Sequence, residues 1–144
     1  MAFFDSSVSR FFIDDTGAAS RNMSPYITAV SGLPGPRRMV PATTINDTGD
    51  KWHPGLQGTT IRLEVQWSDD ALVGPDLVFG LLRTHTSAVN FNYGPEGAVA
   101  GDVKYYGTCW VEDFNITSRV GSLVSATVEI KVEGAVLRGT FPVV

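Results

Sequence analysis

The sequence has little of the side-chain chemistry that builds disulfides, metal sites or catalytic centres. Cys109 is its only cysteine, which excludes an intrachain disulfide and a metal site made of cysteines. Its apolar neighbours indicate a buried strand position, where a free thiol is inert. His53 and His85 are the only histidines, and they fall on different predicted elements with no carboxylate at ligand spacing. We therefore expect neither a metal ion nor any other cofactor.

Charge is also scarce. Charged residues make up 18% of the chain, where about a quarter is usual. The net charge is −4, and the only adjacent basic pair is Arg37 and Arg38, so the composition argues against tight DNA binding, which needs clustered basic residues. Few charges beside 43% hydrophobic residues indicate a partly covered surface, and identical subunits are the commonest cover. A freely soluble monomer is the alternative.

Long hydrophobic runs and enzyme motifs are missing too. No apolar segment approaches the ~20 residues that cross a bilayer. The start, MAFFDSSVSR, lacks the basic and apolar regions of a signal peptide. No phosphate loop, dinucleotide fingerprint or nucleophile elbow occurs. We expect a protein that is made and stays in the cytoplasm, without a membrane partner and without enzymatic activity.

What the sequence does contain is β-strand alternation. In residues 60–68 and 127–133, apolar residues occupy every second position, which predicts strands with one buried face. Residues 75–85 begin with a proline and carry Val78, Leu81 and Leu82 at helical spacing, which predicts a helix. We predict a single, mainly β domain over residues 1–144, a two-sheet sandwich or barrel-like fold with one α-helix packed on it. Weaker predicted strands cover residues 9–14, 26–30, 38–45, 89–93, 103–114 and 137–143.

One short motif points toward an enzyme. Asp-Thr-Gly occurs at residues 15–17 and 47–49, and aspartic proteases use such motifs to bring two carboxylates together. The copies are too close in sequence to belong to two lobes, whereas a homodimeric protease would need only one. Asp, Thr and Gly are also favoured turn residues, and short motifs often match by chance. We favour turns and keep a dimeric aspartic protease using Asp15 as an alternative.

The clearest long connection covers residues 46–58. It is polar and rich in glycine, yet Trp52 and His53 lie in its middle. A tryptophan in such a loop either packs under its own loop or anchors the loop in a neighbouring molecule, since tryptophan is enriched at binding hot spots. Both interpretations stay open from the sequence.

Taken in order, several segments resemble the tail tube proteins of siphophages, the long-tailed bacteriophages. FFIDDTG is similar to an early hairpin with its turn, and NMSPYITAVSGLPGPR to a strand followed by a Gly/Pro turn. MVPATTINDTGDKWHPGLQGTTIRLEVQW is similar to a strand, a long glycine-containing loop and the following strand. A Gly-Pro-Asp helix start, FNYGPEG, GDVKYYGTCWVEDFNITSRVG and SLVSATVEIKVEGAV complete a resemblance that covers nearly the whole chain.

The resemblance implies a structural subunit that forms hexameric rings, which stack into the tube of a virion tail. Its partners would be other copies of itself, the tape-measure protein in the lumen, and the tail terminator and distal tail protein at the ends. DNA would pass transiently and without sequence preference. Assembly would take place in the host cytoplasm. A tail terminator or completion protein of the same fold is the alternative within this class.

The resemblance also implies where copies meet. Residues 46–58 match the family's ring-stacking loop, and an N-terminal arm over residues 1–8 would reach a neighbour. Carboxylates lining the bore would repel phosphates over the ~8 Å range set by physiological salt. The expected contact residues are Asp47, Asp50, Lys51, Trp52, His53, Phe3 and Phe4. The expected lumen-facing residues are Glu64, Glu129 and Glu133, for which an outward-facing placement is equally allowed.

A carbohydrate-binding β-sandwich is the remaining alternative. It would be a monomer with an exposed aromatic platform, for which Tyr105, Tyr106 and Trp110 are the candidates. A tube subunit predicts rings or tubes instead.

Overall fold

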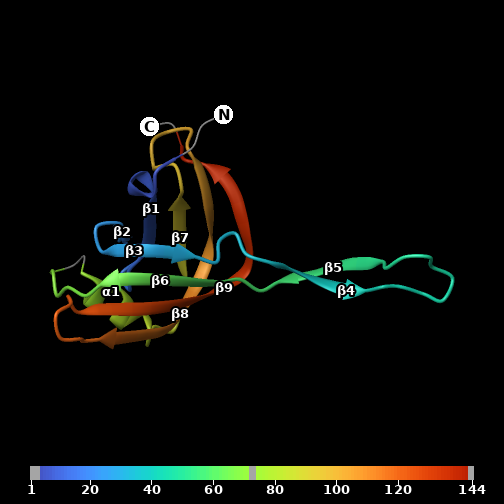
Figure 1. Ribbon diagram of the computed structural model, residues 1–144. Helices are drawn as coiled ribbons and strands as arrows, with labels where there is room; N and C mark the ends of the chain where they lie inside the picture. The colour runs from blue at the N-terminus through green and yellow to red at the C-terminus, as the bar shows by residue number, and fades with distance from the viewer. Residues whose placement is uncertain (1–3, 72–73, 143–144) are drawn as a thin grey trace.

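The computed structural model describes residues 4–71 and 74–142 as a mainly β fold with one short α-helix, which confirms the predicted fold class (Figure 1). Its strands form a seven-stranded antiparallel sheet and a separate two-stranded hairpin. In chain order the elements are η1 (Ser6–Val8), β1 (Arg10–Asp14), β2 (Ser20–Asn22), β3 (Ile27–Ser31), β4 (Arg37–Pro41), β5 (Trp52–Gln57), β6 (Thr60–Gln66), α1 (Pro75–Leu82), β7 (Val89–Gly94), β8 (Val103–Thr117) and β9 (Ser125–Thr140).

The large sheet folds over on itself to enclose the core. Its order is β2-β1-β7-β8-β9-β6-β3, and β3 and β6 cross over β1 and β7 (Figure 1). The bend lies in the long strands β8 and β9, because β7 pairs with the first half of β8 and β6 pairs with the first half of β9. Gly134 sits between the two halves of β9 with a φ of +78°, a conformation that glycine adopts without a steric penalty.

Alternating side chains of this folded sheet meet in one hydrophobic core. Along β6, every second residue is buried while its neighbours face outward, as the period-two pattern predicts. Helix α1 closes one end, where the ring of Phe79 stacks on Phe114 at 6.4 Å. Its Pro75 lies at the first helical position, where no backbone donor is needed. The core consists of Phe11, Ile13, Met23, Ile61, Leu63, Val65, Val78, Phe79, Leu82, Val89, Phe91, Cys109, Val111, Ala126, Val128 and Ile130.

Several predicted boundaries need correction. The expected loop over residues 46–58 contains β5, so the connection is a hairpin whose loop covers residues 42–51. The expected strand over residues 137–143 is instead the end of the 16-residue strand β9. The predicted helix ends at Leu82 rather than residue 85, and β2 has no counterpart among the predicted strands.

Candidate assembly surfaces

The first Asp-Thr-Gly copy forms a braced turn between β1 and β2. One carboxylate oxygen of Asp15, Oδ1, accepts the backbone N–H groups of Gly17 at 2.9 Å and Ala19 at 3.0 Å. The other oxygen, Oδ2, accepts a hydrogen bond from Arg21 Nε at 2.8 Å. The Arg21 hydrogen bond, helped by those backbone donors, holds the pKa of Asp15 below its usual value. An ionised carboxylate with both oxygens engaged suits a turn, not a shared-proton catalytic pair.

The second copy lies in the loop of the β4–β5 hairpin, on a different part of the molecule (Figure 1). Asp47 accepts the backbone N–H of Thr44 at 2.6 Å and pairs with Lys51 Nζ at 2.8 Å. These contacts, led by Lys51, lower the pKa of Asp47. In both copies the aspartate therefore stabilises its own turn, and the two carboxylates do not lie next to each other within one chain.

The β4–β5 hairpin projects from the body of the molecule (Figure 1). Cross-strand partners lie on the same face, and the register pairs Pro41 with Trp52 and Met39 with Pro54. One face of the hairpin is thus an apolar stripe. Trp52 is 55% exposed, so it does not pack under its own loop, and the interpretation that it does is wrong.

The apolar face of this projecting hairpin has no packing partner among the described residues. An isolated two-stranded ribbon is marginally stable in water, and contiguous exposed apolar side chains mark an interaction surface. The loop is nevertheless ordered by Thr43, whose Oγ1 accepts the backbone N–H of Lys51 at 2.8 Å. Asp50 is exposed in the loop, and His53, paired with Val40, is exposed on the opposite face of the hairpin. The arrangement can bind a second apolar surface.

The expected N-terminal arm is described only in part. Phe4 is exposed, whereas Phe3 lies outside the described residues. Asp5 follows and accepts the backbone N–H of Ser7 at 2.9 Å, so it holds the start of η1.

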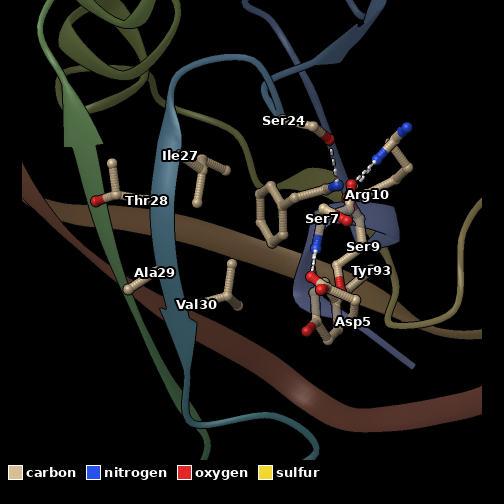
Figure 2. A pocket seen from close by; sticks show the side chains of 11 residues that line it. Asp5, Ser7, Ser9, Arg10, Ser24, Ile27, Thr28, Ala29, Val30 and Tyr93 are labelled. Carbon is tan, nitrogen blue, oxygen red and sulfur yellow. Dashed lines mark hydrogen bonds between the residues drawn. The ribbon is translucent and has the colours of Figure 1, made fainter. Parts of the chain in front are cut away.

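A groove opens between β1 and β3, which face each other across the folded sheet (Figure 2). Its volume is about 540 Å³. Ser24 Oγ accepts the backbone N–H of Phe11 at 2.9 Å, and Arg10 donates to the backbone of Ser7 and Ser9. No histidine accompanies these serines among the lining residues, so the groove holds no serine–histidine pair.

The three expected lumen residues share the polar face of the large sheet. The register sets Glu129 opposite Arg62 and Glu64 opposite Thr127, pointing away from the core. Arg62 Nη2 pairs with Glu129 at 2.7 Å, while Glu133 accepts the indole N–H of Trp110 at 3.3 Å. Within the described residues, Glu64 and Glu133 form no salt bridge.

The other candidate chemistry does not assemble. Tyr105 and Tyr106 are consecutive in β8 and so point to opposite faces, which divides the proposed aromatic platform. Cys109 is buried, and burial raises the pKa of its thiol to about 12. Within residues 4–71 and 74–142, no cluster of three or more His, Cys, Asp or Glu could hold a metal ion. No helix in those residues is long and apolar enough to cross a membrane.

No protein-family model matches the sequence, and no curated protein matches it. Among solved structures, the tail tube of SPP1 overlaps 98% of this chain and 81% of its own, with a TM-score of 0.77 and 10% identity. The tail of an empty gene transfer agent particle with C6 symmetry overlaps 96% of this chain and all of its own, with a TM-score of 0.73 and 12% identity.

A third structure, the SPP1 protein Dit, a hub adsorption protein of phages that infect Gram-positive hosts, matches less completely. It overlaps 85% of this chain but only 49% of its own, with a TM-score of 0.52 and 13% identity. The fold of this chain is therefore the tail tube fold, as the sequence resemblance predicted.

Proposed function

We propose that the protein is a structural subunit of a virion tail tube. Hexameric rings of it would stack into a conduit for the tape-measure protein and later for DNA, with a terminator and a distal tail protein at the ends. The observation that carries this proposal is the overlap of nearly the whole chain with two tail tube structures. The C6 symmetry of one of those tails supports six subunits in a ring.

Three surfaces support the same role. The hairpin offers Trp52 beside Asp47, Asp50, Lys51 and His53 for contact between rings, and the arm with Phe3 and Phe4 offers a second contact. The polar sheet face supplies Glu64, Glu129 and Glu133, and in the bore its free carboxylates would repel phosphates at short range. DNA would then slide past the wall without being held.

Negative-stain microscopy of the concentrated, purified protein, combined with mass measurement, tests the proposal. We expect six-fold rings and tubes whose mass is a multiple of the 15.5 kDa chain. Single closed rings that never stack would favour a tail terminator or completion protein. A stable monomer at high concentration would overturn both roles.

A further inference from the structure

Exposed apolar side chains gather at two opposite ends of the molecule. One end is the β4–β5 hairpin, and the other is formed by α1 with the β8–β9 turn (Figure 1). On α1, Leu77 is 38% exposed and Leu81 is 50% exposed. They lie one turn apart on its outward face, while the opposite face of the helix packs in the core.

The β8–β9 turn lies at the same end of the molecule and adds further exposed apolar side chains (Figure 1). Helix α1 packs against β8 through Phe79 and Phe114, and the turn is tied to the body by the backbone N–H of Trp67, which donates to the carbonyl of Val124 at 2.9 Å. We name the combined surface the helix-end patch. It consists of Leu77, Leu81, Ile116, Val120, Leu123 and Val124, all of them exposed.

We infer that the helix-end patch receives the β4–β5 hairpin of a second copy of this chain. The inference rests on the proposed function and identifies the surface that the hairpin contacts when rings stack. Two complementary surfaces at opposite ends of one chain give a head-to-tail contact that repeats without closing, which is the geometry that stacking needs. The hairpin's apolar stripe, Met39, Pro41, Trp52 and Pro54, supplies the matching side chains.

Charge favours the same pairing. Residues 37–57 of the hairpin carry three basic and two acidic side chains, a net charge of +1, whereas residues 69–83 and 116–124 at the other end carry three acidic and two basic, a net charge of −1. Opposite net charges steer two surfaces together and set their orientation. The β1–β3 groove is the competing seat, but its mouth carries both Asp5 and Arg10 and offers no such sign difference.

Cysteine cross-linking tests the inference on the assembled protein. Ile45→Cys places a thiol on the fully exposed hairpin loop, and Ser122→Cys places one in the β8–β9 turn, without removing any residue of the stripe or the patch. The two variants are mixed, assembled and treated with a short bismaleimide. Native Cys109 is buried and stays unmodified. We expect a cross-linked dimer in the mixture and at least a tenfold lower yield from either variant alone.

Two further pairs decide the alternatives. Ile45→Cys with Val99→Cys, an exposed position before β8, is the matched control and should give no dimer. Ile45→Cys with Ala29→Cys probes the groove, and cross-linking there instead of at Ser122 would overturn the inference. Tubes that form with no Ser122 cross-link would also overturn it and leave the proposed function standing. A mixture that never assembles would overturn both.

Discussion

At the scale of single residues, Asp15 shows how a motif typical of enzymes serves the fold. Its three hydrogen bonds include a charge-assisted one to Arg21, so Asp15→Asn should lower the free energy of unfolding by about 1 kcal/mol near neutral pH. Urea unfolding measures the loss. Asp50→Asn, an exposed carboxylate on the hairpin loop, is the matched control and should leave stability unchanged.

The pH dependence of this difference has a definite sign. The pKa of Asp15 is lowered in the folded state, so its stabilisation is fully present above the unfolded pKa of about 4 and is lost as the pH falls below it. The stabilities of wild type and Asp15→Asn should therefore converge in acid. A constant difference at every pH would contradict the ionised brace, and acid peptide cleavage that Asp15→Asn abolishes would restore the protease alternative.

Cys109 gives a second prediction at this scale. Burial makes its side chain inaccessible and raises the pKa of the thiol to about 12, so the reactive thiolate is scarce near pH 8. We expect no reaction of the folded protein with a chromogenic disulfide reagent, and one equivalent per chain after denaturation in urea. Rapid labelling of the native protein would show that the β8 core opens readily.

At the scale of elements, the hairpin is separable from the core. Trp52→Ala should leave the thermal unfolding midpoint of the monomer nearly unchanged, because the side chain is exposed and surface substitutions cost within about 0.5 kcal/mol. Assembly should suffer, since losing a tryptophan hot spot costs about 2 kcal/mol, or roughly 30-fold in the contact equilibrium. Sedimentation velocity across a concentration series measures this shift.

Val99→Ala is the matched control for Trp52→Ala, because it also trims an exposed apolar side chain but lies outside both ends of the molecule. Its assembly should equal that of the wild type. Unimpaired assembly of Trp52→Ala would show that the hairpin stripe does not contribute to the contact between subunits.

How far the sequence predicts these elements depends on local pattern. Strand β6 alternates cleanly and was predictable, as was the start of α1 at Pro75. Strand β5 was not, because Pro54 and Gly55 are rare in strand interiors and a projecting ribbon has no buried face to impose alternation. The two predicted C-terminal strands merge into β9, since Gly134 bends the strand without ending it.

The surfaces were harder to predict than the core. The apolar stripe assigned to α1 included Leu81, which the structure exposes. Helix α1 is apolar around most of its circumference, so periodicity alone cannot select the side that faces the core. Trp52 was ambiguous for a related reason: only the path of the hairpin away from the body decides between self-packing and contact with a neighbour.

At the scale of the whole molecule, fold and assembly occupy different parts of the chain. The core is complete within the folded sheet and α1, whereas the hairpin, the described part of the arm and the helix-end patch lie outside it. A subunit built this way can fold first and assemble afterwards. Under the proposed function, the polar sheet face would then be free to meet the contents of the bore.

The acidic face gives the last prediction. Glu64 is exposed and unpaired within the described residues, so Glu64→Lys should leave folding intact and reverse a charge that repeats in every copy of the tube. If this face lines the bore, the variant tubes should retain short duplex DNA, and retention should fall steeply between about 50 and 200 mM salt as counterion release predicts. Filter binding measures this. Wild-type tubes are the control and should retain no duplex; retention by Glu64→Lys tubes no greater than by the wild type would place Glu64 outside the bore.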